Sequence, residues 1–170
     1  MTQFGRLSRV VAFAGMALAG GLAGPVLAAQ ADVDLLRSYV GSYKGTGVFT
    51  GASSETVRCN LNLSPGNDDK VNYSGRCTVA GSRLSINGTL AYLNNRYEAA
   101  MTSNAGFSGT AVGKRSGNGV VFNLQDRGKD EDGKDMQLSA DIALQSGTIV
   151  VRFNVTTPDG SYQASVPFSK

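Results

Sequence analysis

Apolar and polar residues alternate along most of this chain, in short segments separated by Gly, Asn, Asp and Pro. Alternation at period two is typical of strands that have one buried and one solvated face. From residue 43 onward we count ten such segments, and their polar positions are mostly Ser, Thr, Asn, Lys and Arg. The pattern therefore predicts an all-β protein of about ten antiparallel strands that follow one another as an up-and-down meander.

The turns test this interpretation, because a slip of one residue would send a whole apolar set to the other face. Short loops rich in Gly, Asn, Ser and Asp separate the segments and suit tight hairpins. Five of them predict the following inward pairs: Val79 with Leu84, Tyr92 with Tyr97, Gly113 with Phe122, Leu144 with Ile149, and Val155 with Tyr162.

Closure of the sheet follows from the cost of leaving it open. An open ten-stranded sheet would have two long unpaired edges and an apolar face in water, whereas a barrel removes both edges. We therefore predict a small closed barrel that forms a single domain over residues 32–170, with a two-sheet sandwich as the alternative. A short helix is expected over residues 32–40, capped by Asp32 or Asp34. Its apolar positions recur at helical spacing and are Leu35, Leu36, Tyr39 and Val40.

The N-terminus carries the pattern of a secretory signal peptide. Arg6 and Arg9 precede an uncharged run over residues 10–27 that is rich in Ala and Gly, and small residues follow it. We predict a signal peptide over residues 1–31, with cleavage two or three residues earlier as the alternatives. The protein is then periplasmic or secreted, and it has no stable membrane insertion after cleavage. No Cys follows the apolar run, so no lipid anchor is expected.

Export changes the interpretation of the charge and of the cysteines. Cleavage removes two Arg and no acidic residue, so 16 basic and 13 acidic residues become 14 and 13, and no nucleic-acid partner is predicted.

A hairpin that closes at residues 65–69 places Cys59 opposite Cys77 on the inward face. Because exported proteins meet an oxidising compartment, we predict a disulfide between them, with two free thiols as the alternative.

The segment Gly41-Ser42-Tyr43-Lys44-Gly45-Thr46-Gly47, preceded by a short helix, resembles the opening of the calycin barrels, which include nitrobindins, fatty-acid-binding proteins and lipocalins. In those families a helix leads into Gly-x-Trp on the first strand, and Tyr43 stands here in place of the Trp. The resemblance implies a cup for an apolar ligand. The haem-binding His of nitrobindins has no counterpart, because this chain contains no His.

The missing His also removes most catalytic schemes and most metal sites. Nearly all acidic residues fall in predicted turns or at outward positions, and no two of them are predicted to face each other across the interior. We therefore predict no enzyme activity, no metal and no cofactor.

Two functions remain open from the sequence. The first is binding of a small apolar or amphipathic ligand inside the barrel, by the candidate residues Tyr43, Tyr73, Tyr92, Tyr97, Phe107, Phe122, Phe153 and Tyr162. The alternative is a solid barrel that acts by protein–protein contact in the cell envelope, as an integrity factor or a protease inhibitor. Its outer face carries Arg58, Arg76, Arg83 and Arg152.

Overall fold

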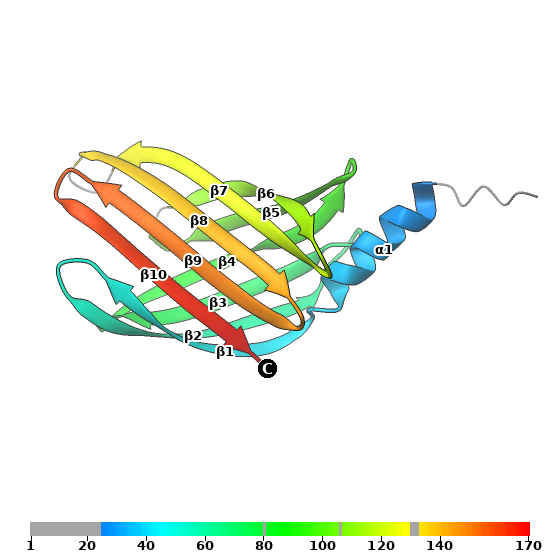
Figure 1. Cartoon of the computed structure of the whole chain (residues 1–170), viewed down its shortest axis with the longest axis horizontal. Coiled ribbons are helices and arrows are strands. Elements are labelled where there is room, and N and C mark those ends of the chain that lie inside the picture. Colours follow the sequence, from blue (N-terminus) through cyan, green and yellow to red (C-terminus); the bar gives the residue numbers. More distant parts are fainter. Residues whose placement is uncertain (1–24, 80, 106, 130–132) are drawn as a thin grey trace, which may run out of the picture.

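The computed structural model describes residues 25–79, 81–105, 107–129 and 133–170. These residues form one helix and ten strands (Figure 1). The elements are α1 (Pro25–Arg37), β1 (Gly41–Thr50), β2 (Ser54–Pro65), β3 (Val71–Val79), β4 (Ser82–Leu93), β5 (Arg96–Ser103), β6 (Ser108–Ser116), β7 (Gly119–Lys129), β8 (Asp135–Gln145), β9 (Thr148–Thr157) and β10 (Gly160–Ser169).

The ten strands form a closed antiparallel barrel. Each strand pairs with the next along the chain, and β1 pairs with β10 to close the ring. At this seam Gly45 lies opposite Phe168, and a Cβ atom on Gly47 would lie only 2.1 Å from the carbonyl oxygen of Ser165. The predicted barrel is confirmed, and the sandwich alternative is wrong. Glycine lets the first and last strands approach closely enough to pair.

Four of the five predicted hairpin registers are confirmed. The exception is the β3–β4 hairpin, where Val79 pairs with Ser82 and Cys77 pairs with Leu84. The predicted pairing of Val79 with Leu84 is therefore wrong by two residues. Gly81 has a φ of 79°, which glycine adopts without strain, and Ser82 is already paired with Val79 as the first residue of β4. A shift of two residues keeps every side chain on its face.

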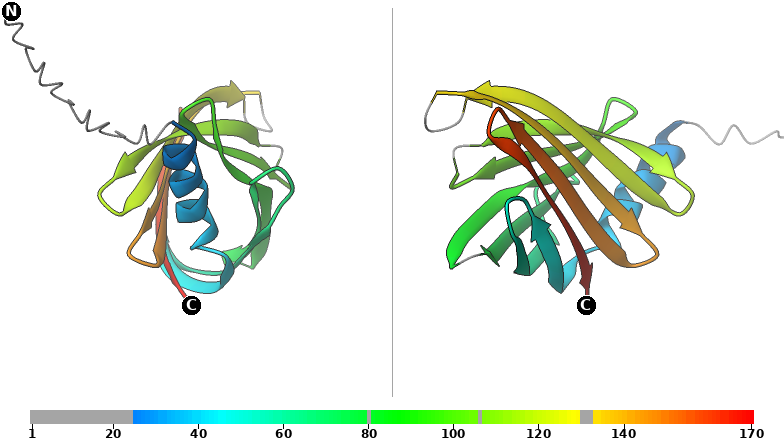
Figure 2. Two further views of the ribbon diagram at one scale, coloured as in Figure 1. Left: turned by 90° about the vertical axis from the view of Figure 1, so that its right-hand side faces the viewer. Right: turned by 60° about the vertical axis from the view of Figure 1, so that its left-hand side comes forward.

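Helix α1 lies across one end of the barrel, as the left view of Figure 2 shows. It begins seven residues before the predicted start at Asp32 and ends at Arg37, so the predicted range of 32–40 is wrong at both ends. Asp32 lies inside the helix and does not cap it. Val33 and Leu36 are buried against the barrel. Of the predicted signal peptide, residues 1–24 lie outside the described residues, and the predicted cleavage point after residue 31 falls within α1.

The most deeply buried part of the core lies at the end of the barrel that α1 covers, which we call the helix end. The largest side chains with almost no exposure all belong to this end: Leu36, Tyr43, Val71, Val120, Phe122, Leu144 and Ile149. Toward the opposite, distal end, the inward apolar side chains are only partly buried, and they include Phe49, Met101, Phe107 and Phe153. The distal half of the interior is therefore the more exposed half.

The predicted disulfide is confirmed. Cys59 on β2 lies directly opposite Cys77 on β3, and their sulfur atoms are bonded. A structural disulfide fits an oxidising compartment outside the cytoplasm. Within the described part of the chain, no helix has the length and apolar character needed to cross a membrane.

Candidate functional site

The interior of the barrel contains a cavity of about 300 Å³. Its walls come from β1–β5 and β8–β10, and Ala105 and Phe107 bring the distal β5–β6 connection into the lining. At its distal side the cavity meets Phe49, Phe107 and Met136. Leu63, Leu144 and Phe168 form its inner side near the helix end. This volume is at the lower limit for sites that bind small molecules.

The lining is almost entirely aliphatic and aromatic. Three lining residues have hydrogen-bonding side chains, namely Asn60, Tyr73 and Ser103, and no lining residue is a Lys, Arg, Asp or Glu. Asn60 is exposed on the outer face of β2, so its polar group does not serve the interior. The Cys59–Cys77 disulfide forms part of the wall and adds apolar sulfur surface. Such a lining suits an apolar group and offers nothing to pair with a charge.

Tyr73 is the one tyrosine of the lining, and its hydroxyl is already bonded to protein. The hydroxyl donates to the carbonyl oxygen of Ala100 at 2.9 Å. Burial raises the pKa of Tyr73 far above its usual value, so the side chain stays neutral. Gly88 allows this arrangement, because a Cβ atom there would lie 1.9 Å from the same carbonyl oxygen. Tyr73 therefore presents its ring, and not a free hydroxyl, to the cavity.

A polar cluster fastens α1 to the helix end of the barrel. The carboxylate of Asp32 accepts hydrogen bonds from the Tyr97 hydroxyl and from Arg115 Nη1, the latter at 2.6 Å. Partial burial alone would raise the pKa of Asp32, but these hydrogen bonds outweigh it and hold the pKa below its usual value. The Tyr92 ring packs edge-on against Tyr97, with ring centroids 4.8 Å apart. Helix and barrel are thus joined by both apolar packing and a charged contact.

Comparison with known proteins identifies the fold. The sequence matches no protein-family model and no curated protein. Solved structures do match. Rv2717c from M. tuberculosis has a TM-score of 0.64 at 14% identity, over 81% of this chain and 96% of that one. The S-type phycobiliprotein lyase CPES from Guillardia theta has a TM-score of 0.51 at 12% identity, over 79% of this chain and 89% of that one.

The fold is calycin-like. A ten-stranded antiparallel meander with a helix at one end agrees with the resemblance of the segment around Tyr43. At these identities the likeness concerns the fold alone, since one fold hosts many functions. One of the two neighbours is called a lyase. The barrel likeness therefore does not decide whether this chain is an enzyme.

The structure divides the eight aromatic candidates between the cavity and its surroundings. Three of them line the cavity, and they are Tyr73, Phe107 and Phe153. Four lie at the helix end, where they pack under α1 or join the Asp32 cluster: Tyr43, Tyr92, Tyr97 and Phe122. Tyr162 stacks on Phe49 near the distal end, with ring centroids 6.0 Å apart. The eight aromatic candidates therefore do not form one site, because five of them lie outside the cavity lining.

Sequence reasoning missed the aliphatic part of the wall as a site. Met101, Met136, Leu138, Ile142 and Val151 line the cavity. All five occupy inward positions of the period-two pattern, so their direction was predictable. Nothing in that pattern distinguishes an inward side chain that fills space from one that borders empty space, because both are apolar. Only the packing of the closed barrel separates them.

A second hollow, of about 350 Å³, lies on the outer surface over β8, β9, β10 and β1. Its walls include Thr50, Ser139, Asp141 and Arg152, whose side chains face away from the interior. Among the described residues no group of three His, Cys, Asp or Glu could hold a metal ion. The interior cavity, being apolar and enclosed by strands, is therefore the better candidate for a binding site.

The Asp32 cluster makes stability depend on acid. Because the folded-state pKa of Asp32 lies below its unfolded value, its contribution is complete above the usual carboxyl range and is lost as pH falls through the folded pKa. We expect Asp32→Asn to lower the free energy of unfolding at pH 7 by about 1–2 kcal/mol, because Arg115 is half exposed. Urea unfolding at pH 7 and at acidic pH measures this difference, which should shrink in acid.

Asp34→Asn is the matched control on the same helix. Asp34 is exposed, and its carboxylate accepts a hydrogen bond from the neighbouring Gln30. Its replacement should leave the unfolding free energy nearly unchanged. If the two substitutions lowered the free energy of unfolding equally, or if the loss caused by Asp32→Asn grew in acid, the role given to Asp32 would be contradicted.

Proposed function

We propose that this protein is exported and binds a small apolar or amphipathic ligand in the barrel, without catalysing a reaction on it. The observation that carries the proposal is the interior cavity of about 300 Å³ with an apolar lining. The cavity favours this function over that of a solid barrel acting as a scaffold. The lining contains no Lys, Arg, Asp or Glu, and the hydroxyl of Tyr73 is bonded to the Ala100 carbonyl and has a raised pKa, which supports binding without catalysis.

The lining also limits which part of a ligand enters. An unpaired charge inside the cavity would lose its hydration and gain no partner, which costs several kcal/mol. The hydroxyl of Tyr73 is occupied by Ala100, so the inner wall offers little even to a neutral polar group. An amphipathic ligand would therefore place its apolar part among Leu138, Ile142 and Phe153 and keep its head group at the distal end. A fully apolar ligand would fit without this constraint.

Export is supported by two features of the chain. Residues 1–31 have the pattern of a signal peptide, and the Cys59–Cys77 disulfide fits an oxidising compartment. We therefore place ligand binding in the periplasm or outside the cell. Amino-terminal sequencing of the protein recovered from a periplasmic fraction would locate the cleavage site, and a chain that keeps residues 1–31 in the cytoplasm would contradict this assignment.

Two measurements test the binding function directly. Native mass spectrometry of gently purified protein, combined with organic extraction, should detect a bound apolar molecule. Titration with a fluorescent apolar probe should give saturable binding at one site. Protein that carries no ligand and binds no probe would overturn the proposal.

Leu138→Trp should block the cavity. Leu138 is a partly buried residue of the lining, so a larger side chain there extends into the cavity. We expect probe binding to weaken about tenfold or more, since overfilling an apolar site costs on the order of 1–3 kcal/mol. The control is Leu93→Trp, because Leu93 is 40% exposed and lies outside the lining. If both variants fold and bind the probe equally well, the interior is not the site.

A further inference from the structure

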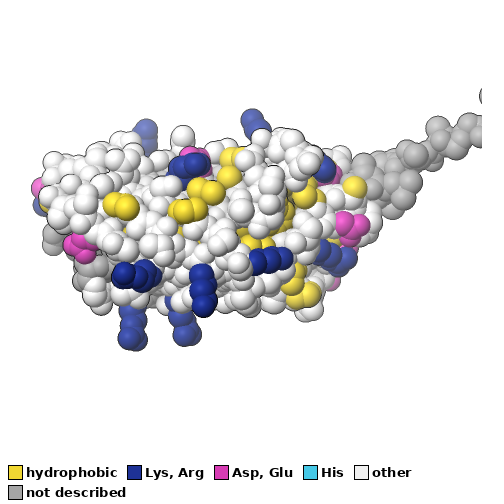
Figure 3. Space-filling view, turned by 60° about the horizontal axis from the view of Figure 1, so that its bottom comes forward, with side chains coloured by type: hydrophobic (Ala, Val, Ile, Leu, Met, Phe, Trp, Pro, Cys, Tyr) yellow, Lys and Arg dark blue, Asp and Glu magenta, His cyan; other side chains and the backbone are white. Residues whose placement is uncertain are grey.

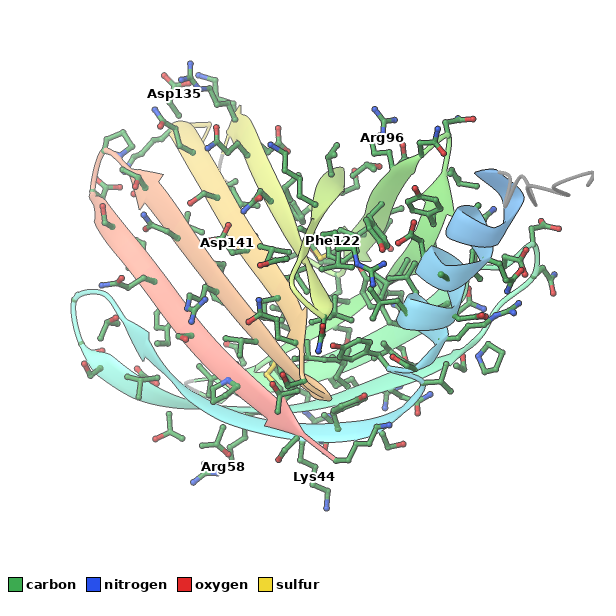
Figure 4. The ribbon with its side chains drawn as sticks, turned by 45° about the vertical axis from the view of Figure 1, so that its right-hand side comes forward. Lys44, Arg58, Arg96, Phe122, Asp135 and Asp141 are labelled. Carbon is green, nitrogen blue, oxygen red and sulfur yellow. A yellow bond between two sulfur atoms is a disulfide. The ribbon has the colours of Figure 1, made fainter. Side chains whose placement is uncertain are left out.

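Four cationic side chains cross the outer face of adjacent strands, and we call them the basic stripe. They are Lys44 on β1, Arg58 on β2, Arg76 on β3 and Arg83 on β4, and all four are exposed. Lys44 and Arg58 point away from the barrel in Figure 4. In Figure 3, Lys and Arg side chains gather across the lower half of this side of the molecule, and the acidic ones lie toward its ends and upper edge.

The strand registers bring these four residues into one zigzag row across the strands. Thr46, two residues after Lys44, lies directly opposite Arg58, so Lys44 and Arg58 are diagonal neighbours. An offset of the same size, alternating in direction, relates Arg58 to Arg76 and Arg76 to Arg83. Diagonal neighbours on one face of a sheet are about 7–8 Å apart at their Cα atoms. Since strands are spaced about 4.8 Å apart, the stripe crosses roughly 15 Å of surface.

No acidic side chain neutralises the stripe on its own face. Glu55 is the one acidic residue of β1–β4, and it lies an odd number of positions from Arg58, hence on the opposite face. None of the four cations forms an ion pair within the described part of the chain. Five other cations do, and they are Arg37, Arg96, Arg115, Lys129 and Lys134. Arg152, on β9, differs because the register places Asp141 beside it.

We propose that the basic stripe docks the protein on the surface of an anionic lipid membrane. The face lacks the features that other anionic partners use. All aromatic residues of β1–β4 occupy inward positions, so none can stack on a base or a sugar ring. The outward residues between the cations are Ser, Thr and Asn. A row of cations without a pocket suits a plane of phosphate head groups, which needs no fixed geometry.

Docking of this kind is peripheral and does not insert the chain. Val48, which is 54% exposed, follows Lys44 and Thr46 on the outer face of β1 and adds a single apolar side chain to the contact. The inference goes beyond ligand binding and does not depend on it.

Vesicle co-sedimentation tests the docking site. We expect the protein to bind phosphatidylcholine vesicles that contain phosphatidylglycerol, not to bind phosphatidylcholine alone, and to dissociate as salt screens the charges. In the stripe variant, Arg58→Gln, Arg76→Gln and Arg83→Gln are combined. Each cation near an anionic surface contributes about fivefold in binding, so the partition of this triple variant onto anionic vesicles should fall about 100-fold.

The matched control removes the same charge from the opposite side of the barrel. It combines Lys114→Gln, Arg127→Gln and Lys129→Gln on β6 and β7, which lie across the ring from β1 and β2. This variant should bind anionic vesicles within a few-fold of the unchanged protein. Equal losses in the two variants would show that net charge alone governs binding and would overturn the proposal.

Two further results separate this site from its alternatives. The Leu138→Trp variant should keep its vesicle binding even where it loses the apolar probe, so failure of one function leaves the other measurable. A protein that binds soluble polyanions such as heparin or single-stranded DNA, but not anionic vesicles at the same ionic strength, would overturn the assignment to lipid.

Discussion

Phe122→Ala is expected to lower the free energy of unfolding by about 3–5 kcal/mol, the usual cost of removing a fully buried aromatic side chain. Phe122 has no exposed surface, and it points into the interior from β7 (Figure 4). Its ring packs edge-on against Tyr97, with centroids 6.4 Å apart, in the dense region under α1. Removal should leave a cavity that the surrounding barrel cannot close. Urea unfolding followed by circular dichroism measures the loss.

Phe107→Ala is the control for this prediction. Phe107 is also an inward phenylalanine, but it is only partly buried and borders the existing cavity. Fewer contacts are lost there, and we expect a cost of about 1 kcal/mol, a typical value for a single substitution. The same variant should alter binding of the apolar probe. If Phe107→Ala destabilised the protein as much as Phe122→Ala, the distal half would be as tightly packed as the helix end.

Loss of the disulfide should have the second large effect on stability. The combined Cys59→Ala and Cys77→Ala variant is expected to have a free energy of unfolding about 3 kcal/mol lower than that of the oxidised protein. The reason is that the cross-link restricts the unfolded chain. The bond joins residues 18 positions apart on paired strands. Chemical unfolding of the oxidised protein and of the variant gives the difference directly.

A reductant separates the bond from the substitution. Dithiothreitol should weaken the unchanged protein by a similar amount and leave the double alanine variant unaffected. Similar stability of the oxidised and reduced forms of the unchanged protein would contradict the prediction. A large further loss in the variant, beyond that of reduction, would show that packing of the two sulfur atoms matters more than the cross-link.

The candidate site was only partly predictable, and the reason lies in packing. The alternation of residues gives the direction of a side chain, and it placed Tyr43, Tyr73 and Phe153 correctly inside the barrel. It does not give the position of a side chain along the barrel axis relative to strands far away in sequence. Tyr43 and Phe153 were therefore both predicted to bind a ligand. Tyr43 instead packs beneath α1 and donates its hydroxyl to the Tyr39 carbonyl.

The outer face shows the same limit. The alternation predicted that Arg58, Arg76, Arg83 and Arg152 point outward. Which of them form one surface depends on the registers of four strand pairs. Three of these add Lys44 to the stripe, and the fourth sets Arg152 beside Asp141. In the β3–β4 hairpin, the two-residue difference from the predicted register changes which residue lies opposite Arg83, and Thr78 occupies that position.

The sequence by itself determined the ten strands, their order, the face on which each side chain lies and the Cys59–Cys77 pair. These depend on local alternation and on short turns, which act over a few residues. Tertiary structure decided where α1 begins, that Asp32 bonds to Tyr97 and Arg115 instead of capping the helix, and that the interior contains a cavity. Each of these depends on contacts between residues distant in the chain, whose distances are set only when β1 meets β10.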